Sequence, residues 1–218
     1  MDKEEIIKET AAFVKKALQG AEGGHDWWHI QRVWKTASTI ARNEVGVDSF
    51  VVELAALLHD IADAKFHDGN EEIGPEAARN FLNSLHVPSE IIFHVEQIIR
   101  NLSFKNSFNP SPFHSKELDI VQDADRLDAI GAVGIARAFN YGGFRNREMY
   151  NPDIPPDLNL TKEQYKSNTG PTLNHFYEKL LLLASRMNTH TGMTMALGRH
   201  QFMENFLSQF YAEWNGEK

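Results

Sequence analysis

The spacing of apolar residues constrains the fold most, because they recur every three or four positions through most of the chain. This period places them on one face of a helix, and no segment shows the alternation typical of a half-buried strand. The length of 218 residues suits one domain with a sizeable core. We therefore expect an all-α, single-domain helical bundle over residues 1–218, with about eight or nine helices. The clearest helical segments are 4–19, 26–42, 49–61, 71–85, 89–101, 115–140, 172–187 and 191–214.

Glycine and proline mark two further regions. The helix expected over 115–140 is rich in Ala and Gly, which predicts close contact with a neighbouring helix. The segment 141–170 contains Gly142-Gly143, Pro152 and Pro155-Pro156 and has no helical pattern of comparable strength. A loop of this length in a compact domain usually has a function or is mobile. We expect a loop or lid at about 141–170 that uses the glycine pair as a hinge, with a subunit contact or disorder as the alternatives.

Charge and composition narrow the range of partners. The chain has 22 basic and 30 acidic residues, a net charge of −8, which argues against polymeric nucleic acid or a membrane as a partner. It has no cysteine, so disulfides and thiolate metal sites are excluded. The opening Met1–Glu5 is acidic, without the pattern of a secretory signal, and no apolar run approaches the ~18 residues of a membrane helix. We expect a cytoplasmic protein, with a symmetric homodimer as the default assembly.

Four residues from separate predicted helices form an ordinary ligand set for a divalent metal: His29, His59, Asp60 and Asp125. The adjacent His59-Asp60 ends the apolar run Leu54–Leu58, where an unpaired charge is costly to bury. A metal ion would compensate that charge. Ligands limited to nitrogen and oxygen favour Mn, Mg, Fe, Co, Ni or Zn with open water positions over a closed structural zinc site. A single helical histidine is more often a core or surface residue, so the prediction depends on the combination.

The sequence around these residues resembles a known family. Leu58-His59-Asp60-Ile61 and Gln122-Asp123-Ala124-Asp125-Arg126-Leu127-Asp128, together with His29, match the H…HD…D signature of the HD-domain phosphohydrolase superfamily. Further motifs are similar to its bacterial YedJ/YpgQ-like branch, and the likeness covers most of the chain. They are His25-Asp26-x-x-His29, Ala55-Ala56-Leu57-Leu58-His59-Asp60-Ile61-x-Asp63, the segment 123–139, Tyr141-Gly142-Gly143 and Asn174-His175-Phe176-Tyr177-x-Lys179-Leu180-Leu181.

The resemblance implies an all-helical HD fold with one metal ion held by His29, His59, Asp60 and Asp125. It also implies hydrolysis of a phosphate ester or anhydride. Members of this branch look like nucleotide pyrophosphohydrolases, which release a nucleoside monophosphate and pyrophosphate. We therefore expect a metal-dependent enzyme acting on (d)NTPs, with Mn or Mg as the first choice of ion and Ni, Co, Fe or Zn left open.

Three residues near these ligands are candidates for proton transfer. Asp63 follows the His-Asp pair by three positions, where several HD families have a catalytic Glu. Asp128 lies one helical turn beyond the last ligand, and His25 one turn before the first. A solvated role, or a hydrogen bond to the second nitrogen of a metal-bound histidine, suits each of them equally well.

An oligophosphate also needs cations and hydrogen-bond donors. Several basic residues lie close in sequence to the ligands or in the long loop, although balancing local acids is the simpler explanation for most of them. His175 and Lys179, four residues apart, match the branch pattern, which suggests that they line the pocket or an interface. The candidates for substrate binding are Arg32, Lys65, Arg126, Arg145, Lys166, His175 and Lys179.

Three alternatives remain open. Two-iron HD proteins have two additional histidines between the His-Asp pair and the last Asp, and His94 and His114 fall in that interval. A nucleotide sensor without turnover would use the same binding residues. A 5′-nucleotidase or a phosphodiesterase would share the ligand set, because activation of a metal-bound water is common to all these hydrolases.

Overall fold

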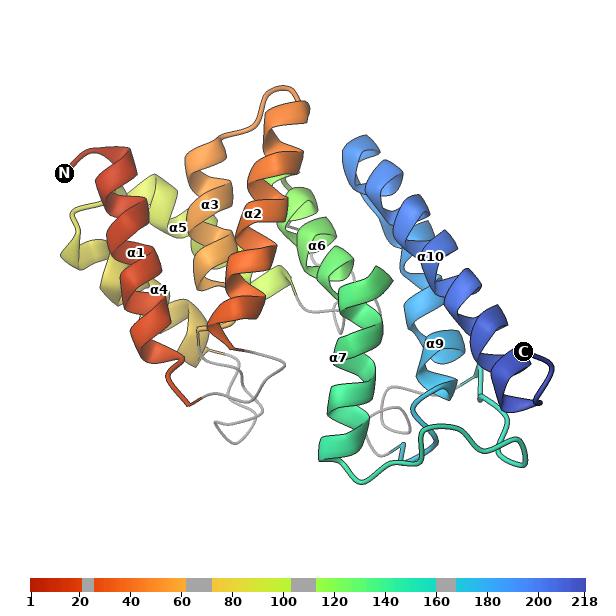
Figure 1. Ribbon diagram of the computed structural model, residues 1–218. Coiled ribbons are helices and arrows are strands. Elements are labelled where there is room, and N and C mark those ends of the chain that lie inside the picture. The colour runs from red at the N-terminus through yellow and green to blue at the C-terminus, as the bar shows by residue number, and fades with distance from the viewer. Residues whose placement is uncertain (21–25, 62–71, 103–112, 160–167) are drawn as a thin grey trace. The chain divides into compact units, whose positions relative to one another are not determined.

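The computed structural model describes residues 1–20, 26–61, 72–102, 113–159 and 168–218. Within these ranges it contains nine α-helices, two short 3-10 helices and no strand, which confirms the predicted all-α fold (Figure 1). The chain divides into two compact units, Met1–Ala124 and Asp125–Lys218, which we describe separately. None of the helices in the described ranges combines the length and apolar character needed to cross a membrane.

The first unit is built around one apolar helix. Its helices are α1 (Lys3–Ala17), α2 (Trp27–Asn43), α3 (Ser49–Leu58), α4 (Ile73–Ser84), α5 (Ser89–Asn101) and most of α6 (Lys116–Asp128). Helix α3 packs against α1, α2 and α5, and it lies between α1 and α2 in Figure 1. Every residue from Leu54 to Leu58 is fully buried. Helix α3 therefore forms the centre of this core, and its last turn leads directly to His59.

Two aspartates fix where the helices near the site begin. The Asp26 carboxylate accepts a hydrogen bond from the His29 amide at 2.9 Å, and the Asp48 carboxylate accepts one from the Phe50 amide at 3.0 Å. Such caps satisfy backbone donors that lack an intrahelical partner. The first cap places His29 in the opening turn of α2.

Helix α6 is tied to the rest of the first unit by three side chains. Lys116 donates to the Val45 carbonyl at 2.7 Å, and Glu117 accepts from the Asp48 amide at 2.9 Å. Gln122 donates to the carbonyl of Asn101, the last residue of α5, at 3.1 Å. These bonds hold α6 along much of its length, and Asp125 follows within the same helix.

The second unit contains the end of α6, α7 (Gly131–Phe144), α9 (Asn174–Glu178), η3 (Leu180–Leu182), η4 (Ala184–Arg186) and α10 (His190–Trp214). Helix α10 packs along α7. The contact is aromatic: the Phe139 ring of α7 lies 6.0 Å from Phe206 and 6.5 Å from Phe210 of α10, measured between centroids. Phe176 of α9 stacks on Phe206 at 5.9 Å. Such pairs add to the stabilisation from apolar burial.

The helix predicted over 115–140 is two helices. Ile130 is extended, with ψ 166°, and Gly131 has φ +75°, a conformation that L side chains rarely adopt. A Cβ on Gly134 would lie 2.2 Å from the Ala129 carbonyl oxygen, so glycine is needed there too. The prediction of one continuous helix was wrong, while the small residues do allow close backbone packing.

The segment 172–187 also differs from the prediction of a single α-helix. Helix α9 ends at Glu178, because Lys179 leaves the helical region with φ −145° and ψ −56°. Two 3-10 turns follow, and Leu180 in the first turn and Leu183 between the two turns are still buried. A period of three residues buries the same apolar positions almost as well as a period of 3.6, so apolar spacing alone does not separate the two helix types.

The loop expected at about 141–170 begins later than its pattern suggested. Helix α7 continues through Gly142-Gly143 to Phe144. A Cβ on Gly142 would lie 2.0 Å from the Thr172 hydroxyl oxygen, so this glycine permits a close contact within the second unit. Residues 145–159 and 168–173 are described, and the part 160–167 lies outside the described residues.

Candidate metal centre

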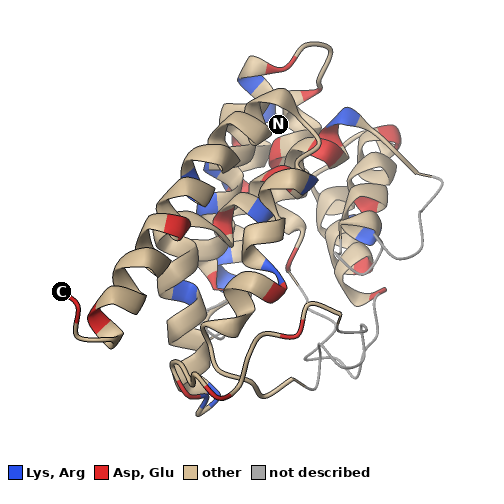
Figure 2. Cartoon of the chain, turned by 90° about the vertical axis from the view of Figure 1, so that its right-hand side faces the viewer, with Lys and Arg blue, Asp and Glu red and all other residues tan. Residues whose placement is uncertain are grey.

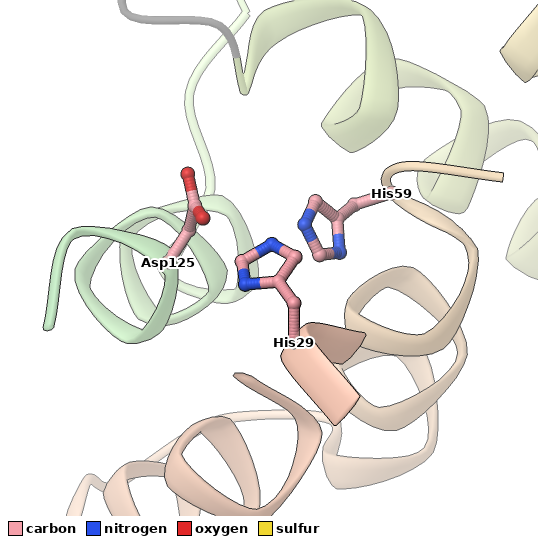
Figure 3. A group of neighbouring side chains, drawn as sticks. All are labelled: His29, His59 and Asp125. Carbon is pink, nitrogen blue, oxygen red and sulfur yellow. The ribbon is translucent and has the colours of Figure 1, made fainter. Parts of the chain in front are cut away.

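Two histidines of the first unit face each other at the ends of their helices. His29, in the first turn of α2, is 2% exposed. His59 directly follows α3. Their ring centroids are 5.4 Å apart and the ring planes meet at 72°, and Figure 3 shows the two rings side by side. The caps and the packing of α2 on α3 therefore bring together two residues that are 30 positions apart.

The hydrogen bond of His59 fixes its tautomer. Its Nδ1 lies 2.9 Å from the Ala56 carbonyl oxygen, and because a carbonyl only accepts, Nδ1 donates the proton. In the neutral ring, Nε2 is then left with a free lone pair. Nε2 is buried and has no hydrogen-bond partner among the described residues. Buried polar atoms rarely stay unpaired, and a backbone carbonyl on the other ring nitrogen is the usual support of a metal-binding histidine.

Asp125 of α6 completes a group of three. Each of His29, His59 and Asp125 offers one ligand atom, and these three atoms lie within 4.8 Å of one another (Figure 3). Two atoms bound to one ion at about 2.1 Å are separated by at most about 4.2 Å. A small inward movement of the side chains would therefore let all three bind the same ion. The group provides two imidazole nitrogens and a carboxylate, which fits a divalent ion.

The fourth predicted ligand, Asp60, lies beside this group. Its Oδ2 is 3.9 Å from Nε2 of His29, and its side chain is 20% exposed. Asp60 is not one of the three residues whose ligand atoms all lie within 4.8 Å. Its role as a ligand remains a prediction, which the short distance to His29 supports.

Asp128, a candidate for proton transfer, is held by an arginine. Its carboxylate is buried and accepts a hydrogen bond from Arg137 at 2.5 Å, and its backbone carbonyl accepts from the same guanidinium at 3.2 Å. A buried carboxylate bonded to a guanidinium is stabilised in its charged form. This geometry suits a structural or positioning role better than the release and uptake of protons.

The other predicted residues in the described ranges belong to several different elements. Arg32 is half-buried on α2, one turn after His29, and Arg145 is exposed directly after α7. Arg126 donates to the Arg186 carbonyl at 2.5 Å. Asp63, His25, Lys65 and Lys166 lie outside the described residues.

His175 and Lys179 lie on and directly after α9. Burial, together with the nearby charges of Lys179 and Arg147, lowers the pKa of His175 to about 3. His175 is therefore neutral at physiological pH. A neutral imidazole can donate or accept a hydrogen bond, but it adds no charge for binding an anion.

The two histidines of the two-iron alternative have other partners. Nε2 of His94 lies 2.9 Å from the Ser115 hydroxyl and 3.6 Å from a Glu117 carboxylate oxygen. His114 lies 3.1 Å from Asp119. Neither belongs to the group of three, which is the only such group in the described part of the chain. The structure therefore gives the two-metal alternative no support there.

The sequence analysis did not identify Arg137 of α7, which bonds to Asp128 at the end of α6. Arg137 lies nine positions after Asp128. On one continuous helix, two residues with this separation would be too far apart to form an ion pair. It approaches Asp128 because the chain turns at Gly131. Only recognition of that turn could have indicated the pair.

Comparisons with known proteins identify the family of this chain. The HD domain matches residues 27–130, a range that includes His29, His59, Asp60 and Asp125. The chain is 36% identical to the YpgQ protein of Bacillus subtilis over 204 residues, which cover 93% of this chain and 90% of YpgQ. This chain belongs to the HD-domain family.

Solved structures of relatives share the fold. A crystal structure of an HD-superfamily hydrolase from Bacillus thuringiensis has 45% identity and a TM-score of 0.78, and the match covers 98% of this chain and 99% of the relative. A crystal structure of Bacillus subtilis YpgQ in complex with ADP has 34% identity and a TM-score of 0.76, with coverage of 98% and 97%. The HD domain is a metal-dependent phosphohydrolase domain, so this chain is an enzyme of the HD hydrolase class.

Proposed function

We propose that this enzyme hydrolyses nucleoside triphosphates to a monophosphate and pyrophosphate, with one divalent ion held by His29, His59, Asp60 and Asp125. The observation that carries the proposal is the buried Nε2 of His59, which has no hydrogen-bond partner among the described residues, in a histidine whose ligand atom lies within 4.8 Å of those of His29 and Asp125. Its lone pair is kept available by the bond from Nδ1 to the Ala56 carbonyl. Mn or Mg is the ion that we expect.

A bound divalent ion would lower the pKa of a coordinated water and polarise a phosphoryl oxygen. The protein's own contribution is positional. The Asp26 cap and the burial of His29 hold the first imidazole, and the Ala56 carbonyl orients the second. Asp60 and Asp125 would supply negative charge beside the two neutral rings. For proton transfer we favour Asp63 or His25, because Asp128 is bonded to Arg137.

The choice of a nucleotide rests on the relative and on the cations. YpgQ has been crystallised with ADP, and it is similar to this chain over nearly all of its length. Arg32 and Arg126 lie close in sequence to the ligands, and we propose that they contact the phosphates together with Arg145, Lys65, Lys166 or Lys179. His175, being neutral, would hydrogen-bond rather than attract charge. The cytoplasmic location and the homodimer remain predictions from the sequence.

The test is product analysis on metal-free protein that is then supplied with Mn²⁺ or Mg²⁺. We would incubate it with NTPs, dNTPs, NMPs and cyclic nucleotides and separate pyrophosphate from orthophosphate. His59→Ala and Asp60→Asn should abolish turnover. His190→Gln, which changes an exposed histidine of α10, should leave it intact. A monophosphate with pyrophosphate supports the proposal.

Other products would replace the proposal. Orthophosphate released from monophosphates would make the enzyme a nucleotidase. Turnover confined to cyclic nucleotides would make it a phosphodiesterase. One bound metal per chain without turnover of any of these would favour a sensor or another phosphate substrate.

A further inference from the structure

Helix α10 contains a single cation in an unusual environment. Arg199 is the only Lys or Arg among its 25 residues, and Figure 2 shows the long helix that ends near the C-terminus as mostly uncharged. Arg199 is half-buried, and burial lowers the pKa of its guanidinium, while the charge of Asp128 opposes that shift. A buried cation is costly unless acceptors surround it.

The donors of Arg199 reach the end of α6. Its Nη1 donates to the Leu127 carbonyl, and Arg137 of α7 donates to the backbone carbonyl of Asp128 at 3.2 Å and to its carboxylate at 2.5 Å. The last four carbonyls of a helix have no intrahelical partner, and cations are favourable there because of the helix dipole. Two arginines from different helices of the second unit thus hold the last turn of α6.

The turn after α6 makes room for this contact. A Cβ on Gly131 would lie 2.9 Å from Cγ and 3.0 Å from Cβ of Arg199, and Gly131 has φ +75°. Glycine therefore serves two purposes at this position. It lets the chain turn into α7, and it lets the aliphatic part of Arg199 lie close to the backbone of Gly131, three residues after the end of α6.

We infer that Arg137 and Arg199 are positioning residues for the carboxylate of Asp125. Asp125 lies two residues before Leu127 and three before Asp128, in the turn that the arginines hold. Side chains at a metal site work only within about 0.5 Å of the productive geometry, so the end of α6 has to be fixed. The inference rests on the proposed metal site and names two residues that support it without touching the ion.

The test measures the affinity for Mn²⁺, by isothermal titration and by the EPR signal of free Mn²⁺, on the full-length metal-free protein. Arg199→Met and Arg137→Met should each weaken binding by about 10-fold to 100-fold, the range seen when groups that orient metal ligands are removed. Arg199→Lys should recover part of the loss, because its ammonium can still donate to the Leu127 carbonyl. Arg42→Gln, an exposed arginine of α2, should bind as the wild type does.

A second control separates positioning from general stability. Leu207→Ala removes a buried side chain from the same helix, so it should lower the melting temperature and leave the Mn²⁺ affinity within about twofold. If Arg199→Met does not fold, Gly131→Ala tests the same contact, because its Cβ would displace the Arg199 stem. That variant should also bind Mn²⁺ more weakly.

The possible failures can be told apart. If the wild type binds one Mn²⁺ and the arginine variants bind it equally well, the inference is overturned and the proposed function stands. The same holds if Leu207→Ala loses as much affinity as they do. If the wild type binds no divalent ion, the proposed function fails and the inference fails with it.

Discussion

His59→Leu should separate metal binding from stability. In the metal-free protein the buried Nε2 of His59 has no hydrogen-bond partner among the described residues, and such an atom costs about 1–3 kcal/mol. Leucine removes that cost. It also removes the bond from Nδ1 to the Ala56 carbonyl, whose net value is about 0.5–1.5 kcal/mol. The two effects nearly cancel, so the metal-free variant should have a free energy of unfolding within about 1 kcal/mol of the wild type.

Addition of Mn²⁺ should then distinguish the two proteins. A ligand at 100 times its dissociation constant stabilises the folded state by about 2.7 kcal/mol. For a chain of 218 residues, this corresponds to an increase in melting temperature of about 5–11 °C. The wild type should show that increase, and His59→Leu should show none.

The assay is thermal unfolding followed by circular dichroism, first with EDTA and then with Mn²⁺. His190→Gln is the matched control, because it replaces an exposed histidine, and it should respond to Mn²⁺ as the wild type does. If metal-free His59→Leu were less stable than the wild type by 3 kcal/mol or more, Nε2 of His59 would have a hydrogen-bond partner in the metal-free wild type. If Mn²⁺ stabilised His59→Leu as much as the wild type, His59 would not be a ligand.

Two further predictions concern the second unit. Arg137→Ala removes the guanidinium that bonds to the buried Asp128 carboxylate and should destabilise the protein by about 3–5 kcal/mol in urea unfolding; a matching loss in Arg137→Ala/Asp128→Leu would show that breaking this ion pair is not the cause. His175 has a folded-state pKa of about 3, below its ordinary value near 6.5, so the unfolded chain binds the extra proton first as the pH falls. Stability should therefore decrease between pH 6.5 and pH 3 by up to about 1.4 kcal/mol per unit from this group, and His175→Gln should flatten the profile. An unchanged slope in that variant would assign the pH dependence to other groups.

Local signals in the sequence predicted much of the fold. Asp26 and Asp48 cap their helices through hydrogen bonds that span only two or three residues, so the sequence alone contains what determines them. The run Leu54–Leu58 forms the centre of the first core, as its composition indicated. The sequence was therefore sufficient to predict the all-α class, the HD family and the hydrolase class.

Features that depend on tertiary contacts could not be predicted from the sequence. The helix break at Gly131 depends on a backbone conformation that a helical pattern of apolar residues does not reveal. The 3-10 turns after Lys179 bury the same leucines that an α-helix would bury. The pairing of Arg137 with Asp128 requires the turn between α6 and α7 to be known first.

The same distinction applies to the candidate site: some of its features could be predicted from the sequence and others could not. The residue types of the ligand set were predictable, because nitrogen and oxygen donors in this combination are chemically specific. The orientation of His59 was not, since it depends on where α3 ends and on a carbonyl three residues earlier. Spacing along the sequence also could not indicate that Asp60 lies outside the group formed by the other three candidate ligands.

The most direct test of the central claim is a crystal of the protein grown with Mn²⁺, with diffraction measured at the manganese absorption edge. Our account predicts one anomalous peak per chain, at about 2.0–2.2 Å from Nε2 of His59 and from ligand atoms of His29, Asp60 and Asp125. A peak bound to other residues, or no peak at this group under conditions where the enzyme is active, would contradict it.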